Sequence, residues 1–280
     1  MNGKTHQVRF GRERTDCPRR PIALTIAGSD SGGGAGMQAD LKTFAALGVH
    51  GTSAITCVTA QNPRAVTGIQ PIRASLVRKQ IGAVFAELTP AAVKTGMLFS
   101  TSLIRTVVEF FERGPRLPLI VDPVMVATSG AVLLKPGAIR LLKERLLPLA
   151  TLVTPNLDEA ELLLGRRLQT IADLEAAARE IHRVFGCAAL VKGGHLRSAP
   201  AATDIFFDGQ KMVRLRAPFV RGVSTHGTGC TYSAAITAFL ARGESLPRAV
   251  AAAKRYITRA ILRSYRAANH TVLQHGPARR

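Results

Sequence analysis

The chain alternates between short runs of apolar residues and longer segments in which apolar residues recur with helical periodicity. The apolar runs have the length of buried strands, and we predict strands at 22–27, 53–59, 92–94, 117–121, 150–154 and 188–192. The periodic segments predict helices at 36–47, 72–88, 101–113, 136–147, 157–164 and 171–185. Strands that alternate with helices of this length predict an α/β fold in which helices cover both faces of a mostly parallel sheet.

The last third of the chain departs from this alternation. Segments 203–208 and 211–215 flank Asp208-Gly209, a dipeptide typical of a tight hairpin. We therefore expect a small antiparallel addition to the sheet. Two more helices are predicted after it, at 230–241 and 246–265.

We interpret residues 21–266 as one domain, because no compositional break interrupts them. Residues 1–20 lack apolar periodicity and are predicted to form a disordered basic arm. Residues 267–280 are predicted to form a basic C-terminal tail.

The chain is strongly basic, and its charge is unevenly distributed. The 280 residues include 38 Lys+Arg and 18 Asp+Glu, a formal net charge of +20. Such an excess raises nucleic acid or an anionic membrane as partners. However, residues 1–20 hold six basic and two acidic residues, and eight basic residues but no acid follow Glu244. More than half of the excess therefore lies near the two ends of the chain.

Composition predicts a soluble, cytoplasmic protein. A hydrophobic content of 46% excludes disorder of the whole chain. The four cysteines show no C-x-x-C spacing, which favours a reduced setting. The basic start is not followed by the apolar segment of a signal peptide. The longest uncharged run, 43–63, is too polar to cross a membrane.

Glycines and polar residues follow the predicted strands, at the edge where an open parallel sheet binds ligands. These segments are 28–36 (GSDSGGGAG), 59–62 (TAQN), 94–97 (KTGM), 122–124 (DPV), 154–156 (TPN) and 192–195 (KGGH). Their convergence on one edge predicts a binding site there.

The first glycine-rich loop, 28–36, matches neither common phosphate-binding pattern. No Lys follows its last glycine, as a P-loop requires, and Met37 breaks the G-x-G-x-x-G register. The loop is either a turn with glycines at unusual dihedral angles or a functional loop. Asp40 lies one turn into the following helix, where it either points back toward the site or complements the helix dipole.

A second glycine loop, 225–231 (THGTGCT), leads directly into an Ala-rich helix. Backbone N–H groups and the helix dipole make it the stronger candidate for an anion site, the alternative being an ordinary helix cap. Cys230 lies in the first turn, where the pKa of a thiol can fall below its usual value of about 8.5. The alternative is a small buried apolar residue. A metal site made by His226 and Cys230 lacks further ligands.

Four more residues lie at strand ends or helix starts. Asn156 and Glu159 have the spacing of a capping box, which we favour, although the same geometry would place a carboxylate where Mg²⁺ can be held. Asp122 ends a buried strand and needs a partner, which favours a role near metal or phosphate. Lys192 either extends to solvent from its strand end or contacts phosphate.

Together these segments resemble the hydroxymethylpyrimidine/phosphomethylpyrimidine kinases of thiamine biosynthesis, in the ribokinase-like superfamily. The motifs occur in the family's order across residues 21–262: AGSDSGGGAGMQADLKTF (27–44), TAQN (59–62), KTGML (94–98), VDPVMVATSG (121–130), TPNLDEA (154–160), VKGGH (191–195) and THGTGCT (225–231). The resemblance implies a three-layer ribokinase-like fold and commonly a homodimer. It also implies phosphorylation, with ATP and Mg²⁺, of 4-amino-5-hydroxymethyl-2-methylpyrimidine and then of its monophosphate.

The resemblance also implies roles for individual residues. The pyrimidine would be held by Gly28, Asp40, Gln61, Met97 and Val124. The catalytic anion hole would consist of Gly227, Gly229 and Cys230, with Cys230 where many members of the superfamily carry a catalytic Asp. ATP would be bound by Asn156, Lys192, Thr225 and Thr228, and Mg²⁺ by Asp122 and Glu159. The family's members usually end in a tail containing Gly, His and Pro, whereas residues 267–272 read AANHTV.

Two alternatives stay open. Pyridoxal kinase is a sister activity on the same scaffold, but Gln61, whose amide both donates and accepts, favours the pyrimidine. A nucleic-acid-binding protein is suggested by the net charge and by Arg255, Arg259 and Arg263, which recur along one face of the last predicted helix. No array of stacking aromatic residues accompanies them, so nucleic acid is not the expected partner.

Overall fold

The structure, a computed structural model, describes residues 18–114, 116–126, 133–134, 136–194, 196, 200–220 and 226–276. Its centre is an eight-stranded sheet in the order β10-β9-β8-β7-β6-β5-β1-β2. The strands are β1 (Ile22–Ala27), β2 (His50–Ile55), β5 (Ala92–Thr95), β6 (Leu119–Val121), β7 (Leu152–Val153), β8 (Ala188–Val191), β9 (Ala202–Phe207) and β10 (Met212–Ala217). β2, β1, β5, β6, β7 and β8 pair in parallel, in that order, and β9 pairs antiparallel with both β8 and β10. Within this sheet β9 therefore runs against the other strands. The predicted parallel sheet and its antiparallel addition are confirmed.

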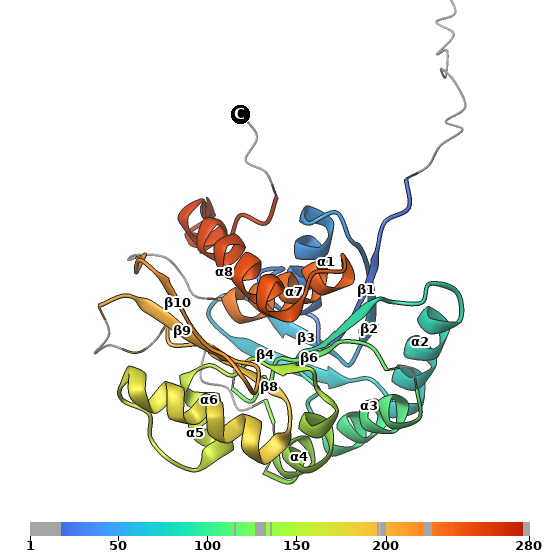
Figure 1. Ribbon diagram of the computed structural model, residues 1–280. Coiled ribbons are helices and arrows are strands. Elements are labelled where there is room, and N and C mark those ends of the chain that lie inside the picture. The colour runs from blue at the N-terminus through green and yellow to red at the C-terminus, as the bar shows by residue number, and fades with distance from the viewer. Residues whose placement is uncertain are drawn as a thin grey trace, which may run out of the picture.

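Helices cover both faces of the sheet, which gives three layers (Figure 1). One face carries α1 (Gly36–Ala46), α7 (Thr228–Ala241) and α8 (Leu246–Leu262). The other carries α2 (Ala74–Glu87), α3 (Thr101–Arg113), α4 (Pro136–Leu141), α5 (Leu157–Leu164) and α6 (Ile171–Phe185). Each face has its own buried apolar cluster, because side chains alternate across the strands. The bounds of α3, α5 and α6 are those that the apolar periodicity predicts.

The predicted strand 53–59 is wrong, because the chain leaves the main sheet at Thr56. The Thr56 hydroxyl donates to the carbonyl of Met97 at 2.6 Å, and its N–H donates to the carbonyl of Ala27. β2 therefore ends at Ile55, and β3 (Cys57–Gln61) pairs with β4 (Val66–Pro71) in a separate antiparallel hairpin. This break places Gln61 on a hairpin rather than at a strand end of the sheet.

Two predicted helices are shorter than expected. Segment 136–147 continues beyond α4 as a π-helical turn (Leu142–Leu146) and a 3₁₀ turn (Leu147–Leu149), since Pro148 has no N–H to continue an α-helix. The last helix ends at Leu262, and the chain turns back as β11 (Tyr265–Ala267) and β12 (His270–Val272). No Gly or Pro lies near residue 263, so the sequence carries no local stop signal for the end of this helix.

The segment after β12 folds back onto α8. Leu273 is buried, and the N–H of Gln274 donates to the carbonyl of Ala260. The division of the chain into an arm, one domain and a tail stays a prediction, and residues 1–17 and 277–280 lie outside the described part. None of the described helices has both the length and the apolar composition needed to cross a membrane.

Candidate active site

A pocket of about 700 Å³ opens at the carboxyl-end edge of the parallel strands, beside α7 and α8. Twelve of the predicted site residues line it: Gly28, Gln61, Met97, Asp122, Val124, Asn156, Glu159, Lys192, Gly227, Thr228, Gly229 and Cys230. Asp40 does not line the pocket and is completely buried. Thr225 lies outside the described residues. The sheet edge thus brings together side chains that are far apart in the sequence, as the strand-end argument predicts.

The first glycine loop is a rigid turn built around Asp30. The buried carboxylate accepts hydrogen bonds from the N–H groups of Gly32, Gly34 and Ala35, at 2.9, 3.1 and 2.8 Å. Gly36 has a φ of +55°, and a Cβ there would lie 2.6 Å from the carbonyl oxygen of Gly28. The loop needs its glycines for this turn and directs three of its N–H groups inward to Asp30.

Asp30 also joins the first glycine loop to the second. Nε2 of His226 lies 2.9 Å from Oδ2 of Asp30. Burial alone would raise the pKa of Asp30, but His226 and the loop N–H groups hold it below its usual value. Gly227 has a φ of +79°, and a Cβ there would lie 1.8 Å from the carbonyl oxygen of Gly34. The two loops therefore pack directly against each other.

The N-terminus of α7 is the strongest candidate for an anion site. Gly227 is the N-cap residue, so it has no side chain to cap the first turn of the helix. Lys192 brings an ammonium to the same place, since a Cβ on Gly229 would lie 3.2 Å from its Nζ. A helix N-terminus beside an ammonium group favours a negatively charged ligand.

Asp122 has the partners that its burial requires. Its carboxylate accepts from Nζ of Lys192 at 3.2 Å, from the hydroxyl of Thr154 at 3.2 Å and from that of Ser233 at 3.1 Å. Burial would raise the pKa of Asp122, but Lys192 and then Lys94 hold it below its usual value. Asp122 is therefore charged at neutral pH and lies against the start of α7.

Glu159 completes the predicted capping box. Its carboxylate accepts from the N–H of Asn156 at 2.8 Å, and its own N–H donates to the side chain of Asn156 at 2.9 Å. Burial and the nearby Asp122 carboxylate raise the pKa of Glu159 to about 7, against the opposing effect of Lys192. Within the described residues, no three His, Cys, Asp or Glu side chains gather as a metal site of their own.

The geometry around Asp40 could not be predicted from local sequence. The structure places no acid in the first turn of α1, so the helix-dipole interpretation of Asp40 is wrong. Asp40 instead accepts from Nζ of Lys94 at 2.9 and 3.0 Å and from the hydroxyl of Thr25 at 2.7 Å, all completely buried. Lys94 lines the pocket. The sequence did carry one signal for this ion pair: Lys94 lies inside the short buried strand β5, where a charged side chain needs a partner.

Cys230 is a partly buried thiol in the first turn of α7. Burial raises its pKa to about 12, although Lys94 favours the thiolate. The carboxylates of Asp40 and Asp122 raise it further. The expectation of a lowered thiol pKa is therefore wrong, because burial and nearby carboxylates outweigh the helix dipole.

Gly28, Gln61, Met97 and Val124 line another part of the pocket. The hydroxyl of Ser31 accepts from the N–H of Gln61 at 2.7 Å and donates to its carbonyl at 2.8 Å. These bonds fix the β3–β4 hairpin over the first glycine loop. They hold Gln61 at the pocket although it lies outside the main sheet.

A third region of the pocket was missed by the sequence analysis. It is formed by the end of β10 and the segment after it (Ala217, Pro218, Phe219, Val220) together with Ile257 and Ile261 of α8. Lys254 lies beside it and pairs with Asp204 at 2.7 Å. These residues follow no parallel strand, so the strand-end argument could not identify them.

The C-terminal segment contacts both α7 and α8. Nε2 of His275 lies 3.1 Å from the hydroxyl of Thr231, and the hydroxyl of Tyr256 donates to the carbonyl of His275 at 2.8 Å. Burial lowers the pKa of His275 to about 4, so its ring is neutral at physiological pH. Residues 275–277 read His-Gly-Pro, so residues of the types found in the family's tail follow the divergent segment 267–272.

Comparison with protein families and curated proteins gives consistent matches. The family model described as phosphomethylpyrimidine kinase matches residues 30–276. A hydroxymethylpyrimidine/phosphomethylpyrimidine kinase of Rhizobium meliloti is 53% identical over 242 residues, which is 86% of this chain and 90% of that protein. A thiamine biosynthesis bifunctional protein of Geobacter sulfurreducens is 47% identical over 94% of this chain, which matches 53% of its length.

Solved structures show the same architecture. The ADP complex of Bacillus subtilis pyridoxal kinase superposes with a TM-score of 0.83 at 36% identity, covering 92% of this chain and 98% of the other. Clostridium difficile phosphomethylpyrimidine kinase superposes with a TM-score of 0.77 at 42% identity, covering 86% and 100%. The three-layer ribokinase-like fold expected from the motifs is confirmed.

Proposed function

The chain belongs to the phosphomethylpyrimidine kinase family, and we propose that its pocket phosphorylates 4-amino-5-hydroxymethyl-2-methylpyrimidine and then its monophosphate, with ATP as donor. The observation that carries this proposal is the start of α7, where Gly227–Cys230 and the ammonium of Lys192 meet at one end of the pocket. Phosphoryl transfer depends mainly on positioning and on neutralising charge, which such a helix start and ammonium can supply.

The pyrimidine occupies the part of the pocket lined by Gly28, Gln61, Met97 and Val124. A Cβ on Gly28 would lie 2.5 Å from Cε of Met97, so a side chain at residue 28 would displace the tip of Met97 in this part of the pocket. The amide of Gln61 both donates and accepts, which suits the edge of an aminopyrimidine. Asp40 does not contact the pyrimidine; its ion pair with Lys94 positions that lysine at the pocket.

The phosphates of ATP lie at the start of α7. The transferring phosphoryl group is bound by the N–H groups of Thr228 and Gly229, in the first turn of α7, together with Thr225. Lys192 neutralises the charge of the phosphoryl group. Asn156 lies at the start of α5 beside them. The apolar region formed by residues 217–220, Ile257 and Ile261 accommodates the base of the nucleotide.

Mg²⁺ would be held by Asp122 and Glu159, where it neutralises charge on the phosphates. Mg²⁺ prefers oxygen ligands and is commonly bound by one or two carboxylates together with phosphates and water. Both carboxylates line the pocket. Burial and the nearby Asp122 carboxylate raise the pKa of Glu159, so a cation bound between the two carboxylates would relieve their repulsion. Lys192 and the helix start hold the phosphates whether or not the metal is present.

Cys230 lies where the substrate hydroxyl meets the phosphoryl group. Since its thiol keeps its proton at neutral pH, the backbone N–H groups around it stabilise the transition state. At higher pH, where more of the thiol is ionised, the thiolate accepts the hydroxyl proton.

The remaining parts of the proposal concern the protein in the cell. We expect a cytoplasmic homodimer that does not bind nucleic acid. Val58 and Leu76 are large apolar side chains about half exposed, at 49% and 50%, and suit a surface covered by a second copy. Sedimentation equilibrium of the full chain tests the dimer directly, and a monomer at micromolar concentration would contradict it.

A substrate panel with ATP and Mg²⁺ tests the activity. The pyrimidine alcohol and its monophosphate are each incubated with the enzyme, and mono- and diphosphate products are separated by ion-exchange chromatography. We expect both products, and Gln61→Ala to raise KM for the pyrimidine with little change in KM for ATP. Absence of both products with active, folded protein would refute the proposed function.

Pyridoxal phosphorylation is a second candidate, because several similar solved structures are pyridoxal kinases, among them a Staphylococcus aureus enzyme with AMP-PCP and pyridoxal at 35% identity. The ratio of kcat/KM for the pyrimidine alcohol to kcat/KM for pyridoxal decides between the two. We expect the ratio to exceed one and to fall in Gln61→Ala, since that variant loses the amide that matches an aminopyrimidine edge.

A further inference from the structure

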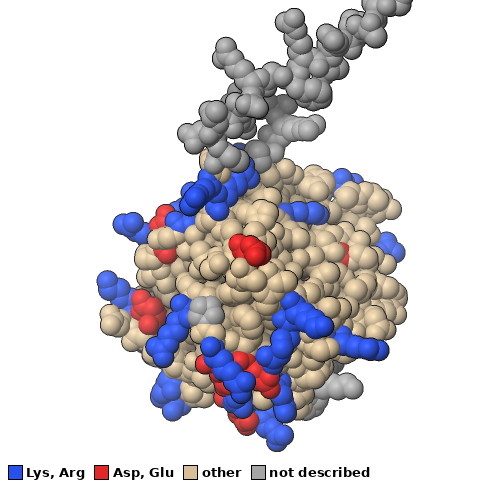
Figure 2. Space-filling view, turned by 90° about the vertical axis from the view of Figure 1, so that its right-hand side faces the viewer, with Lys and Arg blue, Asp and Glu red and all other residues tan. Residues whose placement is uncertain are grey.

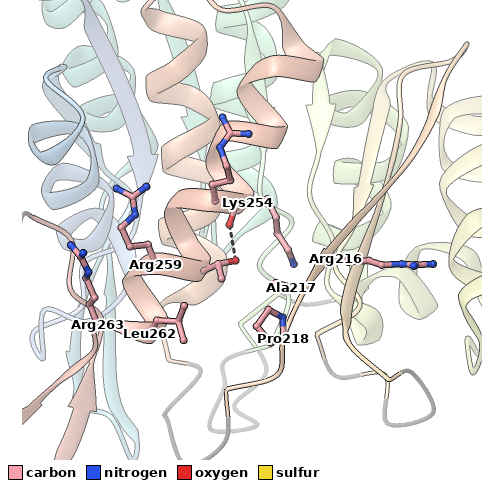
Figure 3. A pocket seen from close by; sticks show the side chains of 9 residues that line it. Arg216, Ala217, Pro218, Lys254, Arg259, Leu262 and Arg263 are labelled. Carbon is pink, nitrogen blue, oxygen red and sulfur yellow. Dashed lines mark hydrogen bonds between the residues drawn. The ribbon is translucent and has the colours of Figure 1, made fainter.

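A second groove, of about 450 Å³, lies between α8 and the end of β10 (Figure 3). It is lined by Arg216, Ala217, Pro218, Lys254, Arg255, Thr258, Arg259, Leu262 and Arg263. Five of these nine residues are Lys or Arg, and none is an acid. We call this surface the arginine groove.

The charges of the arginine groove are mostly uncompensated. Lys254 pairs with Asp204 at 2.7 Å. In the described part of the chain, no acid lies within ion-pair distance of its four arginines, which are all exposed. The face with α2 and α3 differs, since basic and acidic residues are interspersed there (Figure 2). On that face Arg78 pairs with Glu109, for example.

The groove is continuous with the active-site pocket. Ala217, Pro218, Lys254 and Thr258 line both. These shared residues lie beside the apolar region of the pocket that we propose for the base of the nucleotide. A ligand that approaches the pocket along α8 therefore passes the arginines first.

The arginines do not converge on one point. In Figure 3 the side chain of Arg216 extends from β10 away from α8, whereas Arg259 and Arg263 project from α8 on the opposite side. One small anion could not contact all of them. Such an arrangement produces a broad positive potential rather than a built anion site.

We propose that the arginine groove steers the nucleoside triphosphate into the pocket, so that Arg216, Arg255, Arg259 and Arg263 raise its association rate without contacting it once bound. This inference rests on the proposed function, because it requires a polyanionic nucleotide as substrate. Charged surfaces beside a binding cleft raise the association rate of an oppositely charged ligand, and salt removes the effect. The neutral pyrimidine alcohol is not steered.

The test compares two triple charge reversals that change the net charge equally. The first, R255E/R259E/R263E, reverses the groove. The matched control, R105E/R113E/R116E, reverses three exposed arginines on and after α3, across the sheet from the groove. Association and dissociation rates of a fluorescent ATP analogue are measured by stopped flow, at about 0.01 M and about 1 M salt, where the Debye length is roughly 30 and 3 Å.

We expect the groove variant to bind the analogue roughly tenfold more slowly at low salt, and the control variant to differ from the unmodified chain by less than about threefold. At high salt all three proteins should bind at similar rates. The dissociation rate, the kcat at saturating ATP and the KM for the pyrimidine alcohol should stay unchanged. Thermal unfolding verifies that each variant is folded, and R255Q/R259Q/R263Q replaces the reversal if it is not.

Equal association rates at low salt would overturn the inference and leave the proposed function intact. A faster dissociation, or a loss that persists at high salt, would overturn it by indicating direct contact with the bound nucleotide. Binding of a DNA duplex at about 0.15 M salt that only the groove variant abolishes would assign the groove to nucleic acid instead. Failure of the unmodified chain to bind the analogue would refute the proposed function and this inference together.

Discussion

His226 and Asp30 are 196 residues apart in the sequence, and Nε2 of the first lies 2.9 Å from Oδ2 of the second. This contact joins the two glycine loops at the pocket. Asp30 accepts three N–H groups of its own loop, and His226 directly precedes the N-cap residue of α7. The position of the anion site therefore depends on a carboxylate that lies in the other loop.

Asp30→Asn should loosen both loops, because an amide cannot accept from all of these donors at once. We expect the free energy of unfolding to fall by about 1–3 kcal/mol, the cost of leaving buried donors unpaired, and kcat to fall with it. The pKa of Asp30 is lowered in the folded protein, so the stability it contributes is present above its usual value of 3.8 and lost as pH falls. Urea unfolding at pH 7 and pH 3 should therefore show a smaller difference from the unmodified chain at pH 3.

Glu244→Gln is the matched control for this variant, because it also removes one negative charge but at an exposed position. It should leave both stability and kcat within error of the unmodified chain. An Asp30→Asn variant that behaved like this control would show that the loops hold their positions without the carboxylate.

Lys94→Met should leave the Asp40 carboxylate buried without its cation. Removing one partner of a buried ion pair costs about 3–5 kcal/mol, whereas replacing both costs less. The double variant K94M/D40N should therefore be more stable than K94M alone in denaturant unfolding. Arg78→Met, which breaks the exposed pair with Glu109, should cost less than about 1 kcal/mol. If K94M lost as little stability as Arg78→Met, the complete burial of the Lys94–Asp40 pair would be contradicted.

Cys230→Ala should lower kcat more at pH 9 than at pH 7, because only the ionised thiolate can accept the hydroxyl proton, and a general base contributes at most roughly 10²–10⁴-fold. Burial raises the pKa of this thiol to about 12, so the ionised fraction increases with pH throughout the neutral and alkaline range. We therefore expect kcat/KM to increase from pH 7 to pH 9 in the unmodified chain and to stay flatter in Cys230→Ala. Near-normal kcat in Cys230→Ala would leave transition-state stabilisation to the backbone N–H groups alone.

Glu159→Gln separates the capping role of Glu159 from its proposed metal role, since Gln can also accept from the N–H of Asn156. The folded-state pKa of Glu159 is raised from 4.5 to about 7, so the protonated form is favoured and stability decreases as pH rises through that interval. Relative to the unmodified chain, Glu159→Gln should gain stability, on the order of 3 kcal/mol, between pH 4 and pH 8.

The same variant should require more Mg²⁺ for half-maximal activity, because it lacks one carboxylate ligand. Titration of activity with Mg²⁺ at pH 8 measures this. An unchanged Mg²⁺ requirement together with the expected stability profile would restrict Glu159 to the capping box.

Gly227→Ala and Gly243→Ala form a matched pair, because both glycines have positive φ, at +79° and +85°. A Cβ on Gly243 meets no heavy atom within 4 Å, whereas one on Gly227 would lie 1.8 Å from the carbonyl oxygen of Gly34. Gly243→Ala should cost only the backbone strain, about 1–2 kcal/mol. Gly227→Ala should cost more and also lower kcat, because the two loops must separate. Equal losses in thermal unfolding would contradict this packing.

Local patterns in the sequence were enough to predict the elements that build the sheet. Helices α3, α5 and α6 have the predicted bounds, because apolar periodicity and capping residues are local signals. The capping box of Asn156 and Glu159 was predicted for the same reason. The strand predicted at 53–59 was wrong, since β2 ends where Thr56 makes tertiary contacts with Met97 and Ala27, which no local pattern shows.

The sequence by itself determined the α/β alternation, the convergence of polar residues at one sheet edge and, through its motifs, the kinase family. These depend on periodicities and residue types that a chain carries in any conformation. Only the tertiary structure decided which charges are paired, because burial and contacts between distant segments set them. It placed Lys94 against Asp40 and raised the pKa of Cys230 where a helix start alone would lower it. It also gathered beside the pocket four arginines that form no ion pair with any described acid.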